Sequence, residues 1–148
     1  MTLQERLAQE MKAAMLARDA DRLSTLRMLK STMGYIQIER KTESLPDADV
    51  IAIVQKEVKK RRDSIEQFEK GGRAELAEKE KQEITVLESF LPQPLSAEEL
   101  EALVRATIQE LGATTKKDMG PVIKAVQAKA AGRVEGKTVS ALVGKLLP

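Results

Sequence analysis

A glycine-flanked segment near the C-terminus is the stretch of this chain that comes nearest to a site for phosphate chemistry. It reads Gly132-Arg-Val-Glu-Gly136-Lys137-Thr138 and ends in the Gly-Lys-Thr of a nucleotide-binding phosphate loop. That loop needs four residues between its two glycines, and it follows a β-strand. Here three residues separate the glycines, and the apolar pattern before them is helical. We therefore interpret the segment as a turn that leads into a helix.

The lysines around this turn could still bind phosphate without any nucleotide chemistry. Lys137 lies at a predicted helix start, where unpaired N–H groups and the helix dipole attract anions. Residues 112–148 carry an excess of basic over acidic side chains, which makes RNA phosphates the candidate ligand, and a solvated basic surface is the alternative. The predicted RNA-binding residues are Lys116, Lys117, Lys124, Lys129, Arg133, Lys137 and Lys145.

A second basic run lies in the first half of the chain, at Lys59-Lys60-Arg61-Arg62. Four consecutive helical residues point in all directions, so this run cannot form one patch. Arg61 falls on an apolar stripe, and we expect it to pair with a carboxylate because an unpaired buried charge is costly. A charge-laced helix is one interpretation of the run. The other is a second basic surface made of Arg27, Lys30, Arg61 and Arg62.

Carboxylates cluster in the segment that follows a Gly-Gly pair. Paired carboxylates can act as acid and base when their environments separate their pKa values. These alternate with lysines, so the sequence predicts a solvated helix face rather than a catalytic pair. The residues concerned are Glu75, Glu78, Glu80 and Glu83, with Lys79 and Lys81 between them.

The absence of cysteine and histidine limits the chemistry available to this 148-residue chain. It excludes a thiolate nucleophile, a Ser-His-Asp triad, a histidine base and a Cys/His zinc site. We predict no catalytic residues, no metal and no cofactor. The N-terminus lacks the apolar core of a signal peptide, and no apolar run is long enough to cross a bilayer. We therefore expect a cytoplasmic protein with no membrane partner.

Apolar residues recur with a helical period almost everywhere, and no segment alternates as a strand would. Aromatic residues make up only 2% of the chain, so the core must be built from aliphatic side chains. One stripe is Leu3, Leu7, Met11 and Met15, and three more follow before residue 92. The start of the third helix is open, with Ser44 as its cap or Pro46 at its first helical position.

Pro92 and Pro94 form the strongest predicted boundary, because neither can continue a helix. Beyond them, Ser96 and Glu99 are spaced as a capping box that opens a fifth helix. Asp118 is expected to cap a sixth helix, and Gly136 opens a short last one. The sequence thus predicts an all-α fold, with about four helices in an N-terminal domain, residues 1–93, and three in a C-terminal domain, residues 94–148.

Five segments together resemble the GatB/YqeY family, in that family's order and over nearly the whole chain. Two positions depart from the family's pattern: Pro121 stands where we expect lysine, and Glu135 where aspartate is usual. The matching segments are Leu26-Arg-Met-Leu-Lys30, Arg61-Arg-Asp-Ser-Ile-Glu-Gln-Phe68, Leu87-Glu-Ser-Phe-Leu-Pro92, Lys117-Asp-Met-Gly120 and Gly132-Arg-Val-Glu-Gly-Lys-Thr-Val-Ser140.

The resemblance implies a two-part helical protein similar to the tail of the B subunit of glutamine-dependent tRNA amidotransferase. A similar module is appended to some glutaminyl-tRNA synthetases, and in both settings it implies contact with tRNA rather than catalysis. Our first hypothesis is a non-catalytic accessory module that binds tRNA or another structured RNA. A second is a protein-docking module for an amidotransferase or an aminoacyl-tRNA synthetase. A third is a component with carbon–nitrogen ligase activity that uses glutamine as amido-N-donor, although no nucleotide loop or amidase centre is evident.

Overall fold

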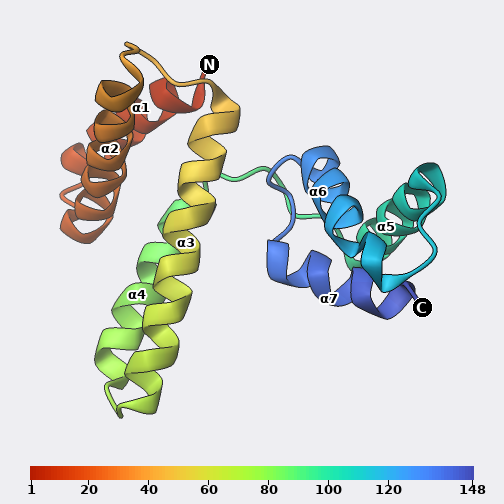
Figure 1. Ribbon diagram of the computed structural model, residues 1–148. Helices are drawn as coiled ribbons and strands as arrows, with labels where there is room; N and C mark the ends of the chain where they lie inside the picture. The colour runs from red at the N-terminus through yellow and green to blue at the C-terminus, as the bar shows by residue number, and fades with distance from the viewer. The chain divides into compact units, whose positions relative to one another are not determined.

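The computed structural model describes residues 1–148 and contains seven α-helices, one 3₁₀ turn and no strand (Figure 1). The prediction of an all-helical protein is therefore confirmed. The chain divides into two compact units, residues 1–91 and residues 92–148. The elements are α1 Leu3–Leu16, α2 Ala20–Arg40, α3 Asp47–Lys70, α4 Ala74–Glu88, α5 Ala97–Leu111, the 3₁₀ turn η1 Lys116–Asp118, α6 Met119–Ala130 and α7 Gly136–Leu146.

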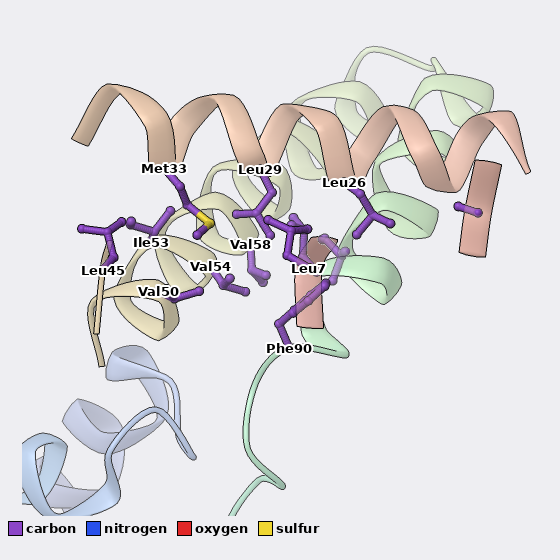
Figure 2. Packing of buried hydrophobic residues seen from close by; sticks show 13 residues of the cluster. Leu7, Leu26, Leu29, Met33, Leu45, Val50, Ile53, Val54, Val58 and Phe90 are labelled. Carbon is purple, nitrogen blue, oxygen red and sulfur yellow. The ribbon is translucent and has the colours of Figure 1, made fainter. Parts of the chain in front are cut away.

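The first unit is built on α1, α2 and the long α3–α4 hairpin, and its core lies where these four helices meet. Figure 2 shows Leu26, Leu29 and Met33 pointing from α2 toward Val54 on α3. Phe90, just after α4, closes the same core and is 1% exposed. Removing so much aliphatic surface from water is the main source of stability for this unit.

Capping residues that are visible in the sequence determine where the first two helices begin. The Thr2 hydroxyl accepts a hydrogen bond from the Glu5 N–H while the Glu5 carboxylate accepts one from the Thr2 N–H, which makes a complete capping box at α1. Asp19 caps α2 by accepting a hydrogen bond from the N–H of Arg22 at 3.1 Å. Both signals are visible in the sequence because they depend only on neighbours three residues away.

The predicted apolar stripe of α1 is wrong at its last member. Met15 is 55% exposed, and Ala14 is buried in its place. A spacing of four residues overshoots the helical repeat of 3.6, so successive members drift by about 40° around the helix. After three such steps from Leu3, Met15 has rotated away from the core.

The start of α3 also differs from both alternatives that the sequence left open. Pro46 itself occupies the cap position of α3, in an extended conformation. Ser44 is therefore not the cap, and Pro46 is not the first helical residue. The first helical residue is Asp47, and its carboxylate accepts a hydrogen bond from the N–H of Leu3 at 2.9 Å. Asp47 thus ties the start of α3 to the start of α1, a contact across 44 residues that local patterns do not reveal.

The second unit packs α5, α6 and α7 around a core of small aliphatic side chains. Val104, Val122, Val126, Val139 and Val143 are all fully buried. The predicted capping box of α5 is confirmed, with the Ser96 hydroxyl accepting from the Glu99 N–H and the Glu99 carboxylate accepting from the Ser96 N–H. Gly112 ends α5 at φ +66°, a left-handed conformation that glycine adopts without strain.

Asp118 occupies the cap position of α6, as the sequence predicted, but its side chain closes the turn that precedes this helix. Its carboxylate accepts hydrogen bonds from the N–H groups of Thr114 and Thr115, at 2.9 and 3.2 Å, and makes no side-chain cap on α6. The 3₁₀ turn η1 intervenes between the two segments, so Asp118 closes that turn instead. Pro121 lies in the first turn of α6, where its missing N–H leaves no bond unmade.

Candidate nucleic-acid interface

The predicted C-terminal basic residues separate into two groups once their surroundings are known. Five of them have exposed side chains that form no ion pair, and we call these the five free lysines. Their ammonium groups remain fully available to an external anion. The five free lysines are Lys116 and Lys117 in η1, Lys124 in α6, and Lys137 and Lys145 in α7.

Packing between α6 and α7 places four of the five free lysines at the two ends of one helix pair, with Lys124 midway along α6. A Cβ added to Gly136 would lie 2.7 Å from the side-chain nitrogen Nε2 of Gln127. The start of α7 is therefore beside the end of α6. A Cβ added to Gly144 would lie 3.4 Å from the terminal methyl of Met119, at the start of α6. The two helices therefore run in opposite directions, and Lys145 lies at the same end as η1.

Lys129 and Arg133 are instead engaged within the unit. Lys129 forms an ion pair with the carboxylate of Glu110 on α5, and its ammonium group also lies 3.4 Å from the hydroxyl of the fully buried Thr107. These contacts join α6 to α5. The predicted role of Lys129 as a phosphate ligand thus competes with an internal carboxylate.

Arg133 anchors the turn that precedes α7. Its Nε donates a hydrogen bond to the carbonyl of Gln93 at 2.8 Å, and its own carbonyl accepts one from the N–H of Leu95 at 2.9 Å. Its guanidinium also lies 3.8 Å from the carboxylate of Glu99. Arg133 therefore positions the turn, and sequence alone gave no means of distinguishing it from the free lysines.

The glycine-flanked turn itself has the geometry of a helix-to-helix connection. It follows α6, not a strand, and it turns at Ala131 and Gly132, both of which have positive φ. Glu135 occupies the cap position of α7 without a side-chain hydrogen bond to that helix start. The interpretation of this segment as a turn into the last helix agrees with these positions.

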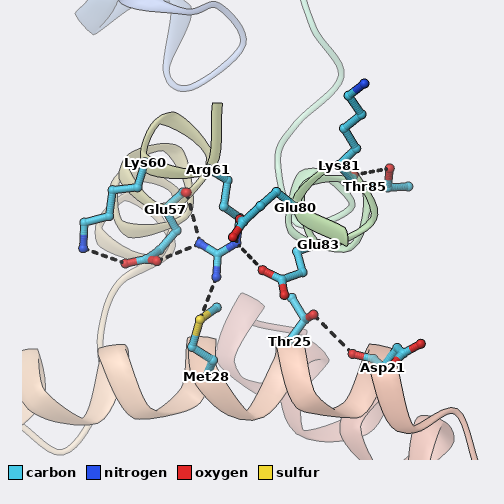
Figure 3. A network of polar contacts seen from close by, with 10 residues as sticks. All are labelled: Asp21, Thr25, Met28, Glu57, Lys60, Arg61, Glu80, Lys81, Glu83 and Thr85. Atoms are coloured by element: carbon cyan, nitrogen blue, oxygen red, sulfur yellow. Dashed lines mark hydrogen bonds and ion pairs between the residues drawn. The ribbon is translucent and has the colours of Figure 1, made fainter. Parts of the chain in front are cut away.

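Arg61 of the possible second basic surface is buried, and its predicted ion pairing is confirmed. Figure 3 shows its guanidinium between α3 and α4, facing α2. It is 7% exposed and donates to the carboxylates of Glu57 and Glu83, each at 2.9 Å. Another of its N–H groups points at the sulfur of Met28 on α2. Because every donor faces inward, Arg61 cannot form part of an RNA-binding surface.

The other members of that second surface are not brought together. Arg27 and Lys30 are exposed on α2, whereas Arg62 is half-buried with its guanidinium 3.6 Å from the carboxylate of Glu88 on α4. Arg62 thus serves the α3–α4 hairpin. The remaining exposed pair on α2 is a much smaller basic patch than the sequence suggested.

Two of the carboxylates expected on a solvated face are partly buried. Glu80 and Glu83 are about one quarter exposed and lie beside Arg61, while Glu75 and Glu78 are exposed. Burial raises the pKa of Glu80, the nearby Glu83 raises it further, and Arg61 opposes the shift. The partial burial of Glu83 could not be predicted from the sequence, because Glu83 contacts Arg61 across 22 residues and the turn of the α3–α4 hairpin. Glu57, one helical turn before Arg61, was the partner that local spacing could have revealed.

A hollow of the second unit has no acidic side chain in its lining. The hollow at the C-terminal end of α5 has a volume of about 260 Å³ and is floored by Ile108, Ala113 and Leu146. Its one charged lining residue, Arg105, is paired with Glu101. No group of three acidic side chains is placed to hold a metal ion. None of the helices is both long and apolar enough to cross a membrane.

Comparison with known proteins gives relatives in several yeasts. An uncharacterized protein of Schizosaccharomyces pombe is 37% identical over 94 residues, which are 64% of this chain and 76% of that protein. The altered inheritance of mitochondria protein 41 of Kluyveromyces lactis is 35% identical over 136 residues, which are 90% of this chain and 69% of that protein. Its namesake in Eremothecium gossypii is 36% identical, over 73% of this chain and 60% of that protein.

These relatives correct the expected location. The two that carry a descriptive name are mitochondrial proteins, which contradicts the prediction of a cytoplasmic protein. That prediction rested on the absence of a recognisable targeting segment, and an absence of this kind does not define a compartment.

The comparison with family models covers almost the entire chain. The model of the YqeY-like protein family matches residues 4–147, which extend over both compact units and all seven α-helices except the first residue of α1. The five segments that carry the resemblance lie within this match. The chain therefore belongs to the YqeY-like protein family.

Proposed function

We propose that this protein is a non-catalytic accessory module that binds tRNA or another structured RNA through its C-terminal unit. The observation that carries the proposal is the set of five free lysines on η1, α6 and α7, none of which is neutralised by an internal carboxylate. Lysine side chains bind phosphate oxygens as point charges, and such contacts hold a nucleic acid without reading its sequence.

The rest of the molecule supports binding over catalysis. Three ionisable groups with clearly shifted pKa values are Glu80, Glu99 and Asp118, and each shift is explained by a structural contact. Burial and the neighbouring Glu83 raise the pKa of Glu80, while Glu99 and Asp118 accept backbone hydrogen bonds, at the start of α5 and at η1, that lower theirs. A catalytic acid or base would instead face a cleft that admits a substrate.

The proposal is tested by the affinity of the full chain for tRNA, measured by fluorescence anisotropy. Changing all five free lysines to glutamine should weaken binding by at least about tenfold, because each lost phosphate contact removes counterion release. The matched control changes five exposed lysines of the first unit, Lys12, Lys41, Lys56, Lys59 and Lys79, to glutamine. Equal losses in both variants would refute a defined interface and leave only general charge attraction.

A second candidate function, protein docking, is favoured by two exposed apolar side chains on α2. Tyr35 and Ile38 are 76% and 77% exposed and lie one helical turn apart. They would contact an amidotransferase or an aminoacyl-tRNA synthetase. The test is binding to a purified enzyme of either class: an apolar contact should survive high salt and be lost in the Tyr35→Ser, Ile38→Ser double variant.

A further inference from the structure

We infer that the five free lysines select the phosphate backbone of double-stranded RNA over that of an unpaired strand, and that they do so without base contacts. This inference rests on the proposed function, since it specifies which form of RNA the same surface binds. Three features of the second unit carry it: the absence of stacking residues, the engagement of both arginines and the rigid spacing of the lysines.

The second unit has no aromatic side chain on which a base could stack. The three aromatic residues of the chain, Tyr35, Phe68 and Phe90, all lie in residues 1–91. Proteins that bind single strands combine a basic groove with aromatic side chains, and each stacked base contributes about 1–3 kcal/mol. Residues 92–148 can therefore offer an unpaired strand only charge.

Both arginines of this unit form contacts within it. Arg105 donates from Nε and Nη2 to the carboxylate of Glu101, at 3.2 and 2.9 Å. Arg133 donates to the carbonyl of Gln93 and lies beside Glu99. A bidentate contact of arginine with guanine would have to compete with these internal partners. The cations without an internal partner are the lysines, which contact phosphate as point charges.

The lysines are also spaced on a rigid support. Lys137 and Lys145 are eight residues apart on α7, which is about 12 Å along the helix axis. In double-stranded DNA the two strands together present one charge per about 1.7 Å of the axis, and each strand by itself contributes one per about 3.4 Å; an RNA duplex likewise combines the phosphates of two strands. Over the length of α7 between these lysines, a duplex thus offers about twice as many phosphates. Fixed cations gain most from such a dense and regular array of charge.

The hollow of the second unit does not provide a pocket for an unpaired base. It lies at the C-terminal end of α5, and none of the five free lysines lines it. Enzymes and readers that capture a single base enclose it between apolar or aromatic walls next to the residues that hold the backbone. The lysine surface lacks such a pocket, which again favours a paired RNA.

The test compares RNA probes on the full chain by fluorescence anisotropy at one salt concentration. Two of the probes are RNA duplexes with unrelated sequences, each of about 16 base pairs, which is the length that a double-stranded RNA-binding domain spans. The third probe is a single-stranded oligo-uridine as long as one strand of these duplexes. We expect the two duplexes to bind equally within about twofold and the oligo-uridine at least about fivefold more weakly. In the Lys124→Gln, Lys137→Gln variant, duplex affinity should fall, while the matched Lys56→Gln, Lys59→Gln variant should bind as the parent chain does.

Each contrary result separates this inference from the proposed function. Equal or tighter binding of oligo-uridine would overturn the preference for duplex but leave RNA binding intact. A difference of about tenfold or more between the two duplexes would overturn the claim that bases are not read. If neither the duplexes, the oligo-uridine nor tRNA bound, the proposed function would fail together with the inference.

Discussion

Arg61 brings a positive charge into the junction of α2, α3 and α4, where three carboxylates surround it. Glu57 and Glu83 accept its hydrogen bonds, and Glu80 lies 3.8 Å away. The buried charges of this cluster stabilise one another, because removing one partner leaves the opposite charge buried without compensation. Arg61 therefore holds three helices in register rather than contributing to binding.

Replacing Arg61 by methionine should lower the free energy of unfolding by about 3 kcal/mol, since the buried Glu57 would keep only its longer contact with the exposed Lys60. The measurement is urea denaturation followed by circular dichroism. The matched control is Lys59→Met, an exposed lysine of the same helix without an ion pair, which should change stability by less than about 0.5 kcal/mol. An Arg61→Met protein as stable as this control would show that the pairing is incidental.

Glu80 gives the cluster a distinct pH dependence. Because the folded state raises its pKa, Glu80 binds a proton more readily when folded, and its ionised form destabilises the fold at neutral pH. Glu80→Gln should therefore be more stable than the parent chain at about pH 7, by less than about 1 kcal/mol for a partly exposed group. The advantage should vanish as pH falls below the ordinary glutamate pKa of 4.5. Unfolding titrations across this range measure it, and an advantage that grew with acidity would contradict burial as the cause of the raised pKa.

For individual residues, the sequence shows which side chains are charged but not which of them form ion pairs within the protein. Arg61 could be expected to pair because it interrupts an apolar stripe. Lys129 and Lys124 look alike in sequence, yet one is held by Glu110 on the neighbouring helix and the other faces solvent. The pair of Lys129 and Glu110 joins residues 19 positions apart, and its formation depends on how the helices pack.

Among the elements, α5 shows how a local signal determines a helix start. Ser96 and Glu99 exchange two hydrogen bonds there, and the N–H and hydroxyl of Ser96 hold the pKa of Glu99 below its usual value. Both bonds satisfy N–H groups that a helix leaves without internal partners. A similar arrangement at Asp118 closes η1 and lowers the pKa of that carboxyl through the Thr114 and Thr115 N–H groups.

Ser96→Ala should cost the second unit about 1 kcal/mol at neutral pH, the usual effect of removing a serine cap. Because the folded state lowers the pKa of Glu99, the stability from its charge is present above pH 4.5 and is lost as pH falls through the folded value. The difference between parent and variant should thus narrow in acid. Thermal unfolding at several pH values tests this, with Ser140→Ala, an exposed serine inside α7, as control. A difference in stability that did not change with pH would show that the Ser96 hydroxyl does not contribute to the lowered pKa of Glu99.

The element boundaries that could be predicted are those set by neighbours in sequence. The caps of α2 and α5 and the glycine ends of α3 and α5 belong to this group. The start of α3 could not be predicted from neighbouring residues. The carboxylate of Asp47 there accepts a hydrogen bond from the N–H of Leu3, 44 residues away in the sequence. The position of Asp118 at the cap of α6 could be predicted, but its hydrogen bonds to η1 could not, because a 3₁₀ turn has no apolar period of its own to reveal it.

At the scale of the whole molecule, two separate cores make each unit a candidate for independent folding. One core is enclosed by α1–α4 and the other by α5–α7. We predict that fragments 1–91 and 92–148 are each helical and unfold cooperatively, the smaller one with the lower stability because short chains bury less of their surface. Circular dichroism of the two fragments should sum to that of the full chain. A fragment that lacked helical signal would contradict this division.

The central claim is that the five free lysines bind RNA phosphates, and the salt dependence of tRNA affinity tests it most directly. Five phosphate contacts predict that log K falls against log salt with a slope of about −3.5 to −4.5. The Lys124→Gln, Lys137→Gln variant should reduce the magnitude of that slope by about 1.4–1.8, and the Lys56→Gln, Lys59→Gln control should leave it unchanged. A parent slope near zero, or equal slopes for the parent and the Lys124, Lys137 variant, would contradict the claim.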